Sequence, residues 1–274
     1  MTGAAAARNR ALLDWYRANG RTLPWRSTSD PWAILVSEVM LQQTQVTRVV
    51  PVYGRFLRRF PSAASLADSE RAAIIAAWED LGYLRRVFHL QRAASVIATD
   101  GWPPPGELRT LPGVGPYTAA AVGAFAFGAH VPAVDVNLRR VLSRWAGSPL
   151  SGDDLAEAAR QALGDAPASD WNQAVMDLAA TTCRPTRPAC ESCPVERWCS
   201  DPDVGIPLRS QSAFEGSVRQ ARAAILKALA AEGSLHSQTI PDRLHLDPAR
   251  VARALERLAG EGLIRRDGEV VRLR

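Results

Sequence analysis

The chain has 274 residues, 47% of them hydrophobic, which is enough apolar material for a folded core. No stretch approaches the roughly 20 uninterrupted apolar residues that a membrane span needs, and the N-terminus does not have the pattern of a secretory signal peptide. We therefore expect a soluble protein that stays in the cytoplasm. The net charge of +5 suits a polyanionic partner, although basic proteins of other kinds also exist.

Arginine supplies nearly all of the positive charge. Among the 33 Lys and Arg residues only Lys227 is a lysine. A lysine amine is the usual group that forms a Schiff base with an aldehyde or ketone. No side chain before residue 227 can act in this way.

The first two hundred residues predict an all-α architecture, because helical segments alternate with Gly, Pro and Asp and no convincing alternating strand appears. One helix is expected to open at Asp30-Pro31, an N-cap followed by proline, and to run through WAILVSEVMLQQTQV. The other helices are expected at 11–19, 69–82, 85–99, 107–111, 117–127, 137–145, 153–163 and 172–180.

A second, smaller domain is expected after a linker at 201–217 that is rich in Pro, Gly and Ser. Helices are predicted at 218–233, at 240–244 and after the cap Asp247-Pro248, and Asp267-Gly268 predicts a type I′ hairpin turn. Three helices and a hairpin indicate a winged helix, so the domains would span 1–200 and 218–274. Winged helices bind DNA or proteins, and the sequence leaves both roles open.

The chain has four cysteines, and all lie within seventeen residues, at positions 183, 190, 193 and 199. Two disulfides in so short a loop are not expected in a reducing cytoplasm, which favours a metal site built from Cys183, Cys190, Cys193 and Cys199. Spacing alone allows zinc as well as an iron–sulfur cluster. Metal bonds would pin the loop RPTRPA at both ends, so that Arg184 and Arg187 could bind a phosphate or simply be solvated.

The string LPGVGPYTA predicts a hairpin between two helices. Gly113 and Gly115 frame Val114 in the turn, and Pro116 suits the first position of the next helix. Amides of the turn and of the helix N-terminus would face a phosphate. The pattern therefore indicates a clamp on the DNA backbone that does not read sequence.

Two carboxylates are expected to lie in different environments. Glu38 sits in a helix with apolar neighbours on nearly every side, so burial should raise its pKa and keep it protonated near neutral pH. Asp135 precedes a helix, where terminal amides favour the ionised form and should lower its pKa, although many such residues are only N-caps. A neutral acid opposite an ionised carboxylate is the arrangement that breaks glycosidic bonds.

These motifs resemble the helix-hairpin-helix DNA glycosylases, the superfamily that includes endonuclease III. LPGVGPYTA, AVDVN and the four-cysteine loop carry that resemblance. LPWR at 23–26, SEVMLQQTQV at 37–46, LGY at 81–83 and WNQAVMDL at 171–178 are similar to the MutY-type adenine glycosylases. The resemblance covers about residues 8 to 200.

The resemblance implies a two-lobed glycosylase fold with a [4Fe-4S] cluster on the cysteine loop, and a monomer that acts on double-stranded DNA with A:8-oxoguanine or A:G mispairs. Glu38 would protonate N7 of a flipped-out adenine, Asp135 would stabilise the oxocarbenium-like sugar, and water would complete the hydrolysis. Tyr117 would hydrogen-bond near the carboxylates, and Asn137 would orient the water or a phosphate. The family's residues for opening the duplex and recognising the base correspond to Trp25, Arg26, Leu41, Gln43, Tyr83 and Gln173.

The strand-cleaving relatives carry a lysine where Tyr117 stands, so the chain is expected to be a monofunctional enzyme. Two alternatives stay open: a T:G or U:G mismatch glycosylase and a non-catalytic iron–sulfur protein that binds DNA. The familiar adenine glycosylase carries a nudix-like C-terminal domain that helps to recognise 8-oxoguanine, and a winged helix is expected here in its place. An enzyme of this kind would be associated with the nucleoid while it acts.

Overall fold

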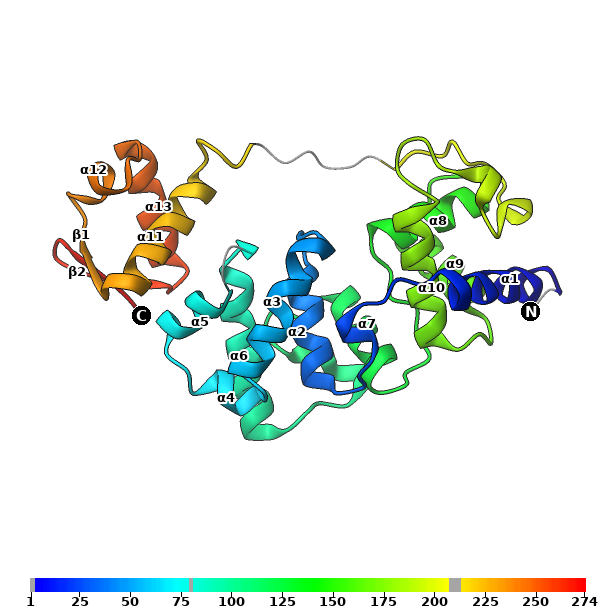
Figure 1. Ribbon diagram of the computed structural model, residues 1–274, viewed down its shortest axis with the longest axis horizontal. Coiled ribbons are helices and arrows are strands. Elements are labelled where there is room, and N and C mark those ends of the chain that lie inside the picture. The colour runs from blue at the N-terminus through cyan, green and yellow to red at the C-terminus, as the bar shows by residue number, and fades with distance from the viewer. Residues whose placement is uncertain (1–2, 79–80, 207–212) are drawn as a thin grey trace. The chain divides into compact units, whose positions relative to one another are not determined.

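The structure is a computed structural model that describes residues 3–78, 81–206 and 213–274. The chain forms two compact units, drawn in Figure 1. Unit 1 comprises Met1–Glu38 and Trp102–Leu208, and unit 2 comprises Val39–Gly101 and Arg209–Arg274. The sequence-based domain boundaries at residues 200 and 217 stay a prediction, and residues 207–212 of the expected linker lie outside the described ranges.

The regular secondary structure in the described residues of unit 1 is all helical. Its longer helices are α1 (Gly3–Asn19), the start of α2 (Pro31–Leu41), α7 (Pro116–Ala126), α8 (Val136–Ala146), α9 (Gly152–Leu163) and α10 (Ala168–Thr181). Its 3₁₀ turns are Pro24–Arg26, Pro105–Thr110, Cys190–Ser192 and Glu196–Trp198. The core joins α1, α8, α9 and α10 around fully buried side chains such as Leu12, Val141 and Trp171. Burial of this apolar surface holds together segments that lie far apart in the sequence.

Unit 2 starts with four helices: α3 (Val46–Arg59), α4 (Ala63–Ala67), α5 (Arg71–Trp78) and α6 (Arg85–Asp100). The expectation of one helix running through residue 46 is wrong. Helix α2 ends at Leu41, because Gln43 adopts a left-handed conformation with φ of 56° that an α-helix cannot contain. The sequence analysis did not predict α3, although Val49, Val52 and Phe56 lie at helical spacing on its buried face.

The end of the chain is a winged helix, which confirms the expected α+β arrangement. Its elements are α11 (Val218–Glu232), β1 (Ser234–His236), α12 (Ile240–Leu244), α13 (Pro248–Gly260), β2 (Ile264–Asp267) and β3 (Val270–Leu273). The antiparallel strands are ordered β1-β3-β2. Strand β1 was not expected from the sequence.

The hairpin between β2 and β3 is present, but its turn differs from the predicted one. Asp267 pairs with Val270, so Gly268 and Glu269 form the turn. Only Gly268 has a positive φ, of 63°, whereas a type I′ turn requires positive φ at both central residues. Among the described helices, none is both long and apolar enough to cross a membrane.

Candidate active site

Glu38 is a buried carboxylic acid of unit 1. It lies near the end of α2 and is only 4% exposed, and this burial raises the pKa of Glu38 to about 7. The charge of Asp135 raises this pKa further, whereas a hydrogen bond from Tyr117 and the charge of Arg26 oppose the shift. Within the described residues, Glu38 Oε2 is buried without a hydrogen-bond partner. A proton on this carboxyl group can therefore be available close to neutral pH.

Tyr117 lies in the first turn of α7, directly after the glycine-framed hairpin. Burial and the neighbouring Glu38 and Asp135 raise the pKa of the Tyr117 phenol well above its usual value. The hydroxyl group therefore keeps its proton and can donate to Glu38. The expected position of Tyr117 beside the two carboxylates is thus present in the structure.

Asp135 is the N-cap of α8. Its Oδ1 accepts from the backbone amides of Asn137 at 2.9 Å and Leu138 at 2.7 Å, and its Oδ2 accepts from Asn137 Nδ2 at 2.7 Å. These three donors fix the carboxylate in one orientation. Asn137 also accepts from Arg140 Nη1 at 3.0 Å, so both ends of its amide hold protein groups.

Two buried arginines of α8 hold the cysteine loop. Arg140 Nε donates to the carbonyl oxygen of Cys183 at 2.9 Å. Arg144 Nη1 donates to Cys183 Sγ at 3.2 Å and to the carbonyl oxygen of Arg184 at 2.9 Å. Hydrogen bonds thus run from Asp135 through Asn137 and Arg140 to the start of the cysteine loop, a link that the sequence analysis did not identify.

The four thiols lie close enough to affect one another electrostatically. Burial and, to a smaller extent, repulsion from the other cysteines raise the pKa of Cys199 to about 11. The pKa of Cys193 is raised for similar reasons. Holding four thiolates together is unfavourable unless a metal group compensates their charge, so the donor set fits a thiolate-ligated cluster. Among the described His, Cys, Asp and Glu side chains, no group of three or more is arranged around a single metal ion. Arg184 and Arg187 of this loop are exposed.

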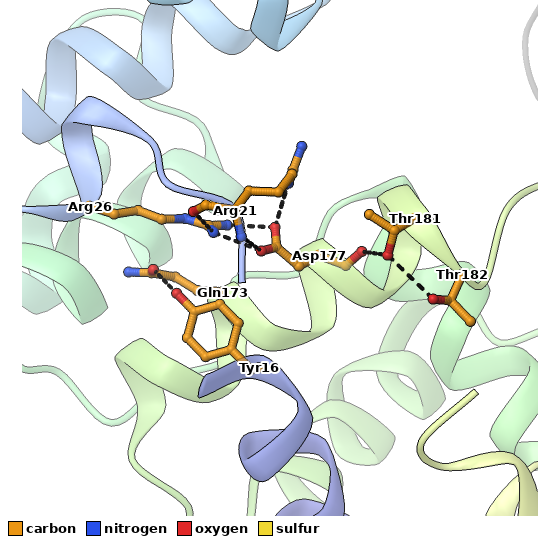
Figure 2. A network of polar contacts seen from close by, with 7 residues as sticks. All are labelled: Tyr16, Arg21, Arg26, Gln173, Asp177, Thr181 and Thr182. Carbon is orange, nitrogen blue, oxygen red and sulfur yellow. Dashed lines mark hydrogen bonds and ion pairs between the residues drawn. The ribbon is translucent and has the colours of Figure 1, made fainter. Parts of the chain in front are cut away.

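A buried ionic network joins α10 to the segment that follows α1 (Figure 2). The Asp177 side chain is fully buried and accepts two hydrogen bonds from Arg26, each of 2.8 Å. Arg21 donates to the same carboxylate from its backbone N at 2.8 Å and from Nε at 2.7 Å. These arginines hold the pKa of Asp177 below its usual value. Asp177 therefore fixes Arg26, whose charge acts on Glu38.

Gln173 lies one helical turn before Asp177 on α10. Figure 2 shows the hydroxyl group of Tyr16 directed at the Gln173 side chain, and Tyr16 Oη donates to Gln173 Oε1 at 2.6 Å. This bond leaves the amide nitrogen of Gln173 directed elsewhere. The Arg26 guanidinium also lies 5.6 Å from the centre of the Tyr16 ring.

The sequence analysis missed Tyr16, Arg21 and Asp177. An acidic residue among the apolar neighbours of α10 could have drawn attention to Asp177, as it did for Glu38. Trp25, in the 3₁₀ turn Pro24–Arg26, is 8% exposed and belongs to the buried surface.

The predicted hairpin has the expected form. Pro105–Thr110 forms a 3₁₀ helix, Gly113 has φ of 81°, and Gly115 caps α7 with Pro116 at its first position. The Val114 amide donates to the carbonyl oxygen of Leu111 at 3.1 Å inside the turn. Gly113, Val114 and Gly115 were predicted to hold a phosphate. The Val114 amide is instead used inside the hairpin, where it stabilises the turn.

The residues predicted to open the duplex lie in unit 2. Leu41 ends α2, Gln43 is exposed in the following turn, and Tyr83 is 36% exposed before α6. Gln43 and Tyr83 have positive φ values of 56° and 48°. Such strain in residues other than glycine is concentrated at functional sites. Arg187 of the cysteine loop shares this feature, with φ of 50°.

Arg86 ties the turn that carries Gln43 to the turn that carries Tyr83. Its guanidinium donates to the carbonyl oxygens of Val39 and Met40, both at 3.0 Å, and also to that of Gln42. It also donates to Thr44 Oγ1 at 3.0 Å and to the carbonyl oxygens of Leu81 and Gly82, both at 3.3 Å. Arg86 thus provides hydrogen-bond donors for the free carbonyl oxygens at the end of α2. This role was not predicted from the sequence.

Comparisons with known proteins give a consistent result. Residues 36–165 match the HhH-GPD superfamily of base excision DNA repair proteins. An adenine DNA glycosylase of Mycobacterium tuberculosis (strain ATCC 25618 / H37Rv) is 38% identical over 97% of this chain and 93% of its own length. That of Mycolicibacterium smegmatis is 40% identical over 92% and 91%, and that of Homo sapiens is 38% identical over 69% and 38%.

Solved structures of DNA glycosylases share the fold. A thermostable thymine-DNA glycosylase superposes with a TM-score of 0.68 at 30% identity, covering 72% of this chain and 95% of that one. A trapped endonuclease III–DNA intermediate gives 0.63 at 20% identity, covering 74% and 98%. The second likeness shows the fold alone.

Proposed function

This chain belongs to the adenine DNA glycosylases of the HhH-GPD superfamily, and we propose that it hydrolyses the N-glycosidic bond of adenine mispaired with 8-oxoguanine or guanine in double-stranded DNA. The observation that carries this proposal is that unit 1 places a buried acid, Glu38, near a carboxylate that caps a helix, Asp135. The names of the relatives favour adenine over thymine or uracil as the base released.

In the proposed mechanism, Glu38 transfers its proton to N7 of the extruded adenine. This proton makes the base a better leaving group as the bond between the sugar and the base breaks. The ionised Asp135 stabilises the positive charge that develops on the sugar, and water then adds at that carbon. Tyr117 holds the Glu38 carboxyl group, and Asn137 acts by holding Asp135, since its amide is already engaged by protein groups.

Base recognition is proposed to involve Arg26, Gln173 and Trp25, with Leu41, Gln43 and Tyr83 opening the duplex. The fixed positions of Arg26 and Gln173 support this, because a side chain that is already ordered loses little entropy when it binds. Gly113, Gly115, Arg184 and Arg187 would contact the backbone. We also propose that the four cysteines hold a [4Fe-4S] cluster, which would fix the loop carrying Arg184 and Arg187.

The enzyme is proposed to be monofunctional, because the only lysine, Lys227, lies on α11 of the winged helix. Without a lysine in the catalytic unit, cleavage of the DNA strand through a lysine Schiff base is not available. Borohydride trapping of an abundant enzyme–DNA adduct would contradict this part of the proposal.

The test is single-turnover base release from matched duplexes with A:8-oxoguanine, A:G, T:G and U:G, followed by alkaline cleavage of the abasic product. We expect release of adenine only, lost in Glu38→Gln and retained in the surface control Glu157→Gln. Release of thymine or uracil instead would favour a mismatch glycosylase. Equal adenine release by Glu38→Gln and the control would refute the assignment of the acid.

A further inference from the structure

Unit 2 contains a pocket of about 430 Å³ that none of the proposed catalytic residues lines. It is formed by α5, by α6, by the turn that follows α13 and by the last residue of the chain. In Figure 1 the chain end, marked C, lies beside α5. This volume is within the range of small-molecule sites in proteins.

Cationic side chains dominate the lining. Arg71 comes from α5, Arg85 and Arg92 come from α6, and Arg274 ends the chain. Arg85, Phe88, His89 and Arg92 follow the spacing of one helical face, and all four line the pocket. The apolar side chains Phe88 and Leu263 are buried and also line the pocket.

The positive charge of this lining is only partly offset by the protein, since Arg222 and, less strongly, Arg85 lower the pKa of Glu261. Among the described residues, no carboxylate forms an ion pair with Arg71, Arg85, Arg92 or Arg274. The one acidic lining residue, Glu261, is engaged by Arg222 through bonds of 2.7 and 2.6 Å. Burial, together with repulsion from Arg92 and Arg274, lowers the pKa of Arg71.

Hydrogen bonds connect the helices of this pocket to the winged helix. Arg71 Nη1 donates to the carbonyl oxygens of Gly262 at 3.1 Å and Leu263 at 3.4 Å in the turn after α13. On α11, Arg219 Nη1 donates to the hydroxyl group of Tyr83 at 3.0 Å. Tyr83 lies two residues before Arg85 in the chain, so one end of the pocket is close in sequence to a residue proposed to open the duplex.

We propose that this pocket binds a phosphoryl group. The group comes either from the DNA backbone or from a free phosphate ester. A phosphate offers the negative charge and the several acceptor oxygens that guanidinium groups without a carboxylate partner bind well. Where the phosphate comes from DNA, the winged helix would anchor the duplex beside Tyr83. The DNA source rests on the proposed function, whereas binding of phosphate by the pocket does not.

The experiment uses the full-length protein and an undamaged duplex, so that base release is not needed for either measurement. Arg92→Gln and the double variant Arg92→Gln/Arg274→Gln remove pocket charges without removing a hydrogen bond of the protein core. Arg59→Gln, an exposed arginine at the end of α3, is the matched control. Duplex affinity is measured across a salt series, and the melting temperature is measured with inorganic phosphate and pyrophosphate.

If the DNA backbone supplies the phosphate, the slope of log affinity against log salt concentration becomes less negative by about 0.9 for each phosphate that a variant no longer binds. Between 200 mM and 50 mM salt, a variant that binds one phosphate fewer gains about 3-fold less affinity than the wild type. The Arg59→Gln control keeps the wild-type slope in this case.

If a free phosphate ester is the ligand, phosphate and pyrophosphate raise the melting temperature of the wild type and the control, but not of the pocket variants. The salt slopes then stay equal, which overturns the DNA source. Equal slopes together with equal responses to both anions in all variants would overturn the proposal as a whole.

Discussion

Replacing Asp177 by asparagine should remove the charge that holds two arginines in the interior of unit 1. The carboxylate accepts from Arg21 and Arg26 at 2.7 to 2.8 Å, and its own side chain is fully buried. Asparagine keeps the shape but presents an NH₂ group to donors on one side. It therefore removes the acceptor for the arginine donors on that side and the negative charge for both arginines.

Breaking a buried ion pair by removing one partner costs about 3–5 kcal/mol. Arg26 is 12% exposed but Arg21 is 32% exposed, so we expect the lower end, about 3 kcal/mol, for Asp177→Asn. This corresponds to a melting temperature lower by roughly 6–12 °C. Because the folded pKa of Asp177 lies below the usual value, the stabilisation is present above about pH 4 and is lost as the pH falls further.

Urea unfolding at pH 7, followed by circular dichroism, measures this loss. Asp14→Asn is the matched control, since Asp14 forms an exposed pair with Arg17 and should change stability by less than about 1 kcal/mol. Asp177→Asn should also slow adenine release at saturating enzyme, because Arg26, whose charge acts on Glu38, is no longer fixed. Unfolding of the two variants at the same urea concentration would refute a stabilising role for the Asp177 charge.

Four further expectations follow from the site. For Glu38, whose pKa is about 7 and which must be protonated to act, log kcat/KM for adenine release should fall by about one per pH unit above 7, and a flat profile to pH 9 would contradict this. Arg86→Lys should lower the urea-unfolding free energy by about 2 kcal/mol, because an ammonium group cannot reach carbonyl oxygens on both turns. Tyr16→Phe should release the Gln173 amide and lower kcat/KM for adenine, with a stability loss of only about 1 kcal/mol. Cys199→Ser should reduce bound iron and visible absorbance, and full retention of both would contradict the proposed cluster.

Local patterns in the sequence predicted the elements whose ends carry recognisable residues. Asp135 as an N-cap, Pro116 at the first position of α7 and the winged-helix order of helices and strands are all present. The helix at 46–59 was not predicted, even though its apolar residues repeat at helical spacing. It contains Pro51 in its interior, a residue that usually indicates the end of a helix. The break after Leu41 depends on the unusual backbone of Gln43, which no composition pattern indicates.

Contacts between distant segments were beyond local analysis. The burial of Glu38 followed from its neighbours, but Arg21 and Asp177 meet across 156 residues, and Arg86 reaches Met40 across 46. Their pairing depends on how the helices pack, and arginine at any of these positions is equally compatible with a solvated surface. Only the tertiary structure identifies which arginines are structural.

Because Asp135 also caps α8, the effect of replacing it depends on which residue takes its place. Alanine at this position would remove the helix cap as well as the proposed charge, costing about 1 kcal/mol and lowering the amount of folded protein through proteolysis. Asparagine caps helices as well as aspartate does, so an Asp135→Asn protein would persist, folded and without its charge. The more conservative exchange therefore isolates the proposed charge from the helix cap, whereas alanine removes both at once.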